Sequence, residues 1–104
     1  MTPIRNAAAL GKPDANQAEI VRALEAAGAV VIDLHAVGGG CPDLMVGFRG
    51  RNYCLEVKTA TGKLRPDQQE FFDTWAGQAA VVRTVEAALE FIGAAEYNIE
   101  ARIE

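Results

Sequence analysis

Residues typical of membrane, secreted and disulfide-stabilised proteins are scarce in this sequence. The 104 residues include two cysteines, one histidine and one tryptophan. No apolar run approaches the ~20 residues of a membrane-spanning helix, and residues 1–13 lack the apolar core of a signal peptide. Cys41 and Cys54 need not pair in a reducing compartment. These absences predict a cytoplasmic protein.

Zinc and phosphate-loop chemistry also find little support. His35, Cys41 and Cys54 follow no pattern of paired zinc ligands, and a fourth ligand is not evident. Cys54 has no evident catalytic partner, and we expect it to be a small packed thiol. The run Gly38-Gly39-Gly40 is not a Walker loop, since no Gly-Lys-Ser/Thr follows it.

Positive charge is in deficit, which at first argues against a nucleic-acid partner. The formal net charge is −4, whereas DNA binding depends heavily on Lys and Arg. Half of the ten basic residues, however, lie between positions 49 and 65, where Glu56 is the only acid. Such a cluster is expected to steer a nucleic acid, although its first members also fit a solvated turn. The cluster comprises Arg49, Arg51, Lys58, Lys63 and Arg65.

The same region predicts a β-hairpin. Residues 43–48 and 53–58 are rich in β-branched and aromatic residues, as strands are. Residues 49–52 predict a turn, in which Gly50 suits the first central position of type II′, where φ is positive. We therefore expect Gly50-Arg51 to form a two-residue loop.

This hairpin would place two carboxylates and an ammonium on one face of a sheet. In the expected register Met45 faces Glu56 and Asp43 faces Lys58, and opposed residues project to the same side. Glu56 and Lys58 also project together, about 6.5 Å apart along their strand. A three-residue loop without a bulge would move Asp43 to the other side. That other side is apolar and predicted to be core: Leu44, Val46, Phe48, Leu55 and Val57.

These polar residues suit phosphodiester hydrolysis. Mg²⁺ or Mn²⁺ takes oxygen ligands, offsets charge on the phosphoryl oxygens and activates water. Asp43 and Glu56 are the predicted ligands, and Lys58 would lie beside the attacking water or the phosphate. An isolated Glu-x-Lys is more often an exposed ion pair of minor energy, so the surrounding segments matter.

Four ordered segments supply that context: Asn16-Gln17-Ala18-Glu19, Gly38-Gly39-Gly40-Cys41-Pro42-Asp43-Leu44-Met45-Val46-Gly47, Glu56-Val57-Lys58 and Leu64-Arg65-Pro66-Asp67-Gln68. Together they resemble the VRR-NUC group of PD-(D/E)xK nucleases, over about residues 14–92. The likeness is greatest to the short stand-alone members of phages and bacteria, which implies a bacterial or phage-infected host cell.

The resemblance implies further site residues. The backbone carbonyl of Val57 would join the metal ligands, and Glu19 would bind or orient the metal through water. Gln17 would act likewise or serve as a capping-box partner. Gln68 would align the water or touch phosphate, unless it is merely an exposed amide near a helix start. DNA contacts are predicted from the glycine run and the basic residues outside the catalytic group: Gly39, Gly40, Arg49, Arg51, Lys63 and Arg65.

The rest of the chain frames the hairpin. Its order, α-β-β-β-α-β-α, predicts an α/β fold with a mixed central sheet flanked by helices, which matches the restriction-endonuclease-like core of the resembled family. We expect two of Phe71, Phe72 and Trp75 to be core residues. The flanking elements are a helix capped by Asp14 and ending at Gly28, a buried strand at 29–34, a helix from Pro66 to Gly77, a core strand at 79–83 and a short helix capped by Thr84.

We expect a single nuclease domain over residues 1–104, with a flexible arm at 1–13 and a tail at 93–104. Residues 96–104 of this tail alternate apolar and polar side chains, which is compatible with an extra strand, a dimer contact, a frayed helix or disorder.

The sequence thus predicts a metal-dependent endonuclease that hydrolyses DNA. The resemblance implies a Holliday-junction-resolvase-like enzyme that acts on four-way or branched DNA as a homodimer, since two-fold symmetry supplies two equivalent centres. The alternatives are a nuclease fold that binds nucleic acid without cutting it and an assembly protein whose Glu-x-Lys strand is merely surface.

Overall fold

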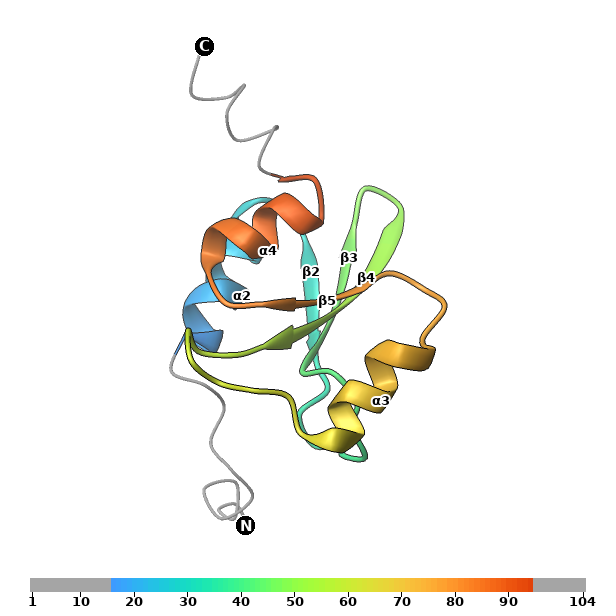
Figure 1. The fold of residues 1–104 in the computed structure, drawn as a ribbon. Helices are drawn as coiled ribbons and strands as arrows, with labels where there is room; N and C mark the ends of the chain where they lie inside the picture. Colours follow the sequence, from blue (N-terminus) through green and yellow to red (C-terminus); the bar gives the residue numbers. More distant parts are fainter. Residues whose placement is uncertain (1–15, 95–104) are drawn as a thin grey trace.

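A computed structural model describes residues 16–94 and contains one mixed sheet with helices on both faces (Figure 1). The predicted element order is confirmed, whereas the predicted arm and positions 95–104 of the predicted tail lie outside the described residues. Among residues 16–94, no helix has both the length and the apolar character needed to cross a membrane. In chain order the elements are α2 (Gln17–Ala26), β2 (Val30–Asp33), β3 (Leu44–Phe48), β4 (Arg51–Val57), α3 (Pro66–Thr74), β5 (Ala79–Val82) and α4 (Val85–Phe91).

The sheet has the strand order β2-β3-β4-β5. The first three strands pair antiparallel, and β5 pairs parallel with β4. Parallel neighbours need a crossover connection, which the segment containing α3 supplies. This arrangement is the predicted mixed sheet.

The turn of the β3–β4 hairpin lies one residue earlier than predicted. Phe48 pairs with Arg51, so the loop is Arg49-Gly50 rather than Gly50-Arg51. Both loop residues have positive φ, 53° and 81°, as a type I′ turn requires and the predicted type II′ turn does not. The Arg49 guanidinium lies over the Phe48 ring, 5.1 Å from its centroid, so this non-glycine residue gains a contact at the strained position.

The shifted turn moves every cross-strand pair by two positions but preserves the predicted faces. Met45 faces Cys54 instead of Glu56. Because the loop still has two residues, side chains alternate as expected and Asp43, Glu56 and Lys58 remain on one side.

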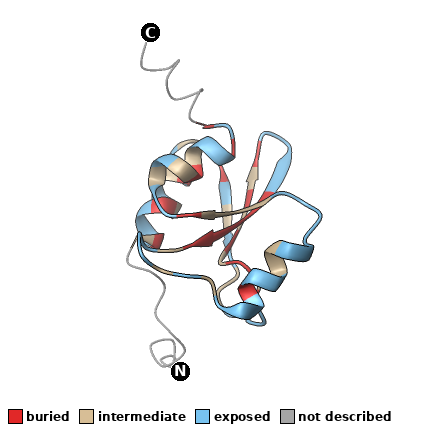
Figure 2. Ribbon diagram, in the orientation of Figure 1, coloured by how far each residue is buried: buried red, intermediate tan, exposed pale blue. Residues whose placement is uncertain are grey.

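Helices α2 and α4 cover the opposite side of the sheet. The sheet residues that were predicted to form the core on this side are almost fully buried (Figure 2). Burying such side chains is worth roughly 1.5–3 kcal/mol each. This layer therefore holds the sheet rigidly behind its polar face, the side that carries Asp43, Glu56 and Lys58. The cluster joins Ile20, Leu24, Ala88 and Ile92 of the helical layer to Leu44, Val46, Phe48, Tyr53, Leu55, Val57 and Val82 of the sheet.

Strand β2 is not the buried strand that its apolar run predicts. It lies at the edge of the sheet, and Val30 and Ile32 are 69% and 56% exposed. Val31 alone of its apolar residues packs against the core cluster. An apolar run cannot reveal by itself whether both faces of a strand are covered, and here one face is open.

The first turns of α2 and α4 are capped differently. The N-cap of α2 is Asn16, not the predicted Asp14, and its side chain makes no capping bond. Asn16 Nδ2 instead donates to the carbonyl oxygens of Lys58 and Arg83, at 3.2 and 3.0 Å. It therefore ties the helix start to the ends of β4 and β5. At α4, Thr84 is the cap, as predicted, and accepts from the Ala87 N–H.

The aromatic residues of α3 are less buried than predicted. Phe71 and Phe72 are half-buried and Trp75 is 48% exposed. Phe71 stacks on Trp75 with ring centroids 4.9 Å apart. These rings pack mainly on one another because α3 stands off the sheet, and its buried residue is Gln68.

Candidate active site

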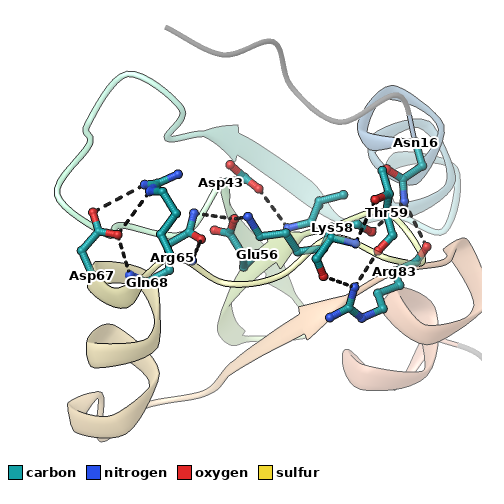
Figure 3. Close-up of polar contacts among 11 residues, drawn as sticks. Asn16, Asp43, Glu56, Lys58, Thr59, Arg65, Asp67, Gln68 and Arg83 are labelled. Atoms are coloured by element: carbon teal, nitrogen blue, oxygen red, sulfur yellow. Dashed lines mark hydrogen bonds and ion pairs between the residues drawn. The ribbon is translucent and has the colours of Figure 1, made fainter.

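Asp43 and Glu56 meet at the end of the hairpin away from its turn. Asp43 immediately precedes β3 and Glu56 is the penultimate residue of β4. Continuing the β3–β4 register by one pair places them opposite each other. Asp43 Oδ2 accepts a hydrogen bond from the Val57 N–H at 2.9 Å, which holds the carboxylate against β4 (Figure 3).

The Glu56 carboxylate is buried between two other polar side chains. The residue is 2% exposed. Its Oε2 atom accepts a hydrogen bond from Gln68 Nε2 at 3.0 Å and lies 3.5 Å from Lys58 Nζ. Its Oε1 atom is buried and finds no hydrogen-bond partner among the described residues. A buried carboxylate oxygen without a donor is costly, and a bound cation would satisfy it.

Burial raises the pKa of the Glu56 carboxyl to about 7, and the negative charge of Asp43 adds to the increase. The charge and hydrogen bond of Lys58 oppose it. A proton on Glu56 can also be donated to Asp43 in a hydrogen bond, which favours the protonated form and raises the pKa of Glu56 further. The two carboxylates therefore repel each other when both are ionised. Such a pair is expected where a metal ion binds, because the ion offsets the repulsion.

Cys41 lies close to this acidic pair. Burial raises the pKa of its thiol, and the charges of Glu56 and Asp43 raise it further. Burial also raises the pKa of the Cys54 thiol, with a contribution from Cys41. Cys54 is buried and unpaired, in agreement with a packed thiol. Both thiols favour the protonated form, which is a poor nucleophile and a poor metal ligand.

Gln68 joins α3 to the acidic pair. Its Oε1 atom accepts the Arg65 N–H at 2.9 Å, while its Nε2 donates to Glu56. The residue is buried, so it is not the exposed amide that a helix start often carries. One side chain thus caps the helix and orients a carboxylate.

Gly40 packs directly against the start of α3. A Cβ atom at this position would lie 2.8 Å from the Asp67 carbonyl carbon, and the residue has φ +86°. Gly39, by contrast, has open space around its Cα. The glycine run therefore lets the chain before Asp43 approach α3 closely, while contact of Gly39 and Gly40 with DNA stays a prediction.

The acidic pair fits a hard divalent cation. Mg²⁺ commonly binds through one or two carboxylates and keeps several waters, and the unpartnered Oε1 of Glu56 is an oxygen of the required kind. Within residues 16–94, no group of three or more His, Cys, Asp or Glu side chains is arranged to hold a metal. Asp43 and Glu56 would therefore bind the ion together with waters, substrate oxygens or the Val57 carbonyl.

The remaining predicted site residues lie on α2 and at the hairpin turn. Glu19 is exposed in the first turn of α2 and does not join a three-acid cluster in the described part of the chain. Gln17 is buried, with an Oε1 atom that has no partner among the same residues. Arg49 and Arg51 lie at the turn, separated from Asp43 by β3, or roughly 17 Å of strand.

Two predicted basic residues lie nearer, in the connection between Lys58 and Gln68. Lys63 is exposed. Arg65 forms an exposed ion pair with Asp67, Nε to Oδ1 3.3 Å, a contact worth little in stability. Their DNA-binding roles stay predictions.

One solved structure, described as a VRR_NUC domain, is similar to this chain. The TM-score is 0.56 and the sequence identity is 26%, over 74% of this chain and 94% of that chain. The chain has a VRR-NUC fold. This finding confirms the predicted family resemblance and the restriction-endonuclease-like fold class. Comparison with protein-family models gives no match, and comparison with curated proteins gives none either.

Within the VRR-NUC fold, the sequence analysis missed the contribution of Arg83. Its Nη1 atom donates to the carbonyl oxygens of Thr59 and Gly62, at 2.6 and 2.7 Å (Figure 3). These carbonyls belong to the connection that runs from Lys58 to Gln68. The missing information was the pairing of β4 with β5, which the strand sequences do not specify.

Replacing Gln68 with alanine is expected to lower the free energy of unfolding by about 1–3 kcal/mol, because Glu56 Oε2 and the Arg65 N–H each lose a buried partner. The measurement is urea denaturation without added metal. Gln69→Ala, at an exposed neighbouring position, should change stability by roughly 0.5 kcal/mol or less. Equal effects of the two variants would contradict the assigned role of Gln68.

Stability of the metal-free protein is expected to fall as pH rises through the range set by Glu56. Folded Glu56 holds its proton to about pH 7, whereas an unfolded glutamate loses it near 4.3. Unfolding thus releases a proton between these values, so the free energy of unfolding decreases with rising pH. Thermal melts in EDTA from pH 5 to 8 should show Glu56→Gln gaining stability relative to the unaltered protein. A pH-independent difference between the two would refute the raised pKa.

Proposed function

We propose that the protein is a divalent-metal-dependent endonuclease that hydrolyses DNA phosphodiester bonds. The observation that carries the proposal is the buried Glu56 carboxylate beside Asp43, with Lys58 Nζ 3.5 Å from its Oε2 atom. A surface ion pair, the ordinary explanation of Glu-x-Lys, would not be 2% exposed at its acidic end. The nuclease character of the VRR-NUC fold supports the same reaction class.

The roles of the residues follow from their chemistry. Asp43 and Glu56 would hold Mg²⁺ or Mn²⁺, with the Val57 carbonyl as a further ligand and Glu19 acting through water. When bound, the ion would supply charge neutralisation at the phosphoryl group and an activated water. Gln68 Nε2 donates to Glu56 Oε2 and so orients the carboxylate, which leaves Oε1 without a hydrogen-bond partner among the described residues and available to an ion.

Lys58 completes the polar group. Its ammonium is held beside the carboxylates by Glu56 and by the position of its backbone, whose N–H donates to the Val82 carbonyl at 3.0 Å. From there Lys58 Nζ donates a hydrogen bond to a phosphoryl or attacking oxygen, where negative charge develops. Its role is electrostatic and does not require it to lose a proton.

The substrate we propose is four-way or branched DNA, cut by a homodimer. The family resemblance supports this preference, and a two-fold dimer matches the symmetry of a four-way junction. The exposed apolar side chains of β2, Val30 and Ile32, are compatible with burial against a second subunit. Sedimentation of the free protein and its junction complex measures the stoichiometry.

Cleavage of synthetic DNA tests the function. The full chain is incubated with labelled four-way junctions, flaps and linear duplexes in Mg²⁺, Mn²⁺ or EDTA. We expect metal-dependent products, with junctions or flaps cut faster than duplex. Binding without products on any substrate would leave only a non-catalytic DNA-binding module. Equal cutting of all substrates would exclude the structural preference alone.

A further inference from the structure

Arg83 lies beside Lys58 on the face of the sheet that carries Glu56. The β4–β5 register pairs Glu56 with Val81 and Val57 with Val82. The Lys58 N–H bonds to the Val82 carbonyl at 3.0 Å, which continues the parallel ladder and pairs Lys58 with Arg83. Because paired residues of neighbouring strands project to the same side, Arg83 belongs to the polar face, whereas Val82 belongs to the core.

The guanidinium of Arg83 is anchored at one of its three nitrogens. Nη1 carries two hydrogens and donates to two carbonyl oxygens, those of Thr59 and Gly62. The backbone is anchored as well, because the Arg83 carbonyl accepts from Asn16 Nδ2. A guanidinium has five N–H donors in a planar fork, so anchoring Nη1 orients the donors of Nε and Nη2.

No carboxylate in residues 16–94 neutralises this charge. The two ion pairs of that part of the chain, Lys58–Glu56 and Arg65–Asp67, do not involve Arg83. The side chain is exposed. A cation that is oriented, solvent-accessible and without an acidic partner is suited to an anionic ligand.

We propose that Arg83 binds a phosphodiester group of the DNA strand entering the site, next to the phosphate that is cut. This inference rests on the proposed nuclease function and adds a substrate contact to it. Lys58 and Arg83, as paired residues on adjacent strands, lie within the spacing of neighbouring β-strands, about 4.8 Å between backbones. They present two cations to one strand of DNA. The anchored fork lowers the entropy lost when the phosphate binds.

Salt-dependent DNA binding tests this contact without any need for cleavage. Dissociation constants are measured in EDTA for a labelled four-way junction and a duplex over a range of NaCl concentrations. Arg83→Gln removes the charge but keeps an amide that donates to carbonyl oxygens. We expect binding roughly tenfold weaker and a plot of log K against log salt that is shallower by about 0.9, the change for one phosphate contact on duplex DNA.

Three further variants complete the design. Arg83→Ala also removes the charge, and Arg83→Lys restores it and should recover the salt slope. Arg22→Ala removes one exposed charge from α2, the helix whose buried residues pack on the core side of the sheet, and should leave the slope unchanged. Circular dichroism establishes that each variant is folded.

The outcomes separate this inference from the function on which it rests. An unchanged slope in folded Arg83→Gln or Arg83→Ala, or an equal loss in Arg22→Ala, overturns the Arg83 contact alone. A shallower slope together with no metal-dependent cleavage supports the contact and overturns the nuclease. Failure of the unaltered protein to bind either DNA overturns both.

Discussion

Asp43→Asn is expected to lower the rate of metal-dependent DNA cleavage by roughly 10²–10³-fold, the usual effect of removing one preorganised electrostatic group. Asparagine preserves the shape and still accepts the Val57 N–H bond made by Asp43 Oδ2. It removes the negative charge that, with Glu56, would hold the metal. Because that charge also raises the pKa of Glu56, the metal-free variant should be as stable as the unaltered protein or more stable.

The measurements are single-turnover cleavage in Mg²⁺ and thermal melts with and without the metal. Metal should raise the melting temperature of the unaltered protein more than that of Asp43→Asn, because a ligand that binds the folded state stabilises it. Asp73→Asn, at an exposed position of α3, serves as the matched control and should cut normally. Unimpaired cleavage by Asp43→Asn would remove Asp43 from the catalytic group.

Gly40→Ala is expected to lower the free energy of unfolding by about 2–5 kcal/mol. The left-handed backbone, φ +86°, disfavours alanine by roughly 1–2 kcal/mol. The new methyl group would also meet the Asp67 backbone, with 2.8 Å to its carbonyl carbon, and such overpacking adds about 1–3 kcal/mol. Relief requires movement of α3 away from the chain that leads to Asp43, so the link from Gln68 to Glu56 should weaken and cleavage should fall.

Gly39→Ala separates the two contributions. Gly39 has φ +64° but nothing within 4 Å of an added Cβ, so only the backbone penalty of about 1–2 kcal/mol applies. Urea denaturation of both variants gives the comparison. If Gly39→Ala is as destabilising as Gly40→Ala, the close packing of Gly40 on α3 is not what requires glycine there.

Local patterns in the sequence predicted most of the fold because they report local physics. Alternation along the hairpin identified the buried side, and the structure buries it. Pro66 and Thr84 start their helices as predicted. The errors arose where a local pattern fits two environments. The apolar run of β2 suits a central strand or an edge, and the aromatic residues of α3 suit a core or a self-packed cluster.

The hairpin turn shows the same limit on a smaller scale. Arg49-Gly50-Arg51-Asn52 permits two-residue loops at either of two positions, and glycine alone favours the type II′ assignment. The type I′ turn found here places non-glycine Arg49 at positive φ. The prediction that Asp43, Glu56 and Lys58 share a face is nevertheless correct, because the predicted and the observed loop both have two residues. The side to which a residue projects depends on whether the loop length is even or odd, not on which two residues form the turn.

The sequence by itself determined that Glu56 and Lys58 share one side of a strand, because side-chain alternation is a property of each strand. It placed Asp43 on the same side through the predicted two-residue loop, whose parity the structure keeps. Tertiary structure alone decided that Gln68 donates a hydrogen bond to the buried Glu56 and that Arg83 lies beside Lys58. Those contacts depend on the path of the connection through α3 and on the parallel register of β4 and β5. Neither is encoded by a short-range pattern, because both are fixed by how the helices and the sheet pack together.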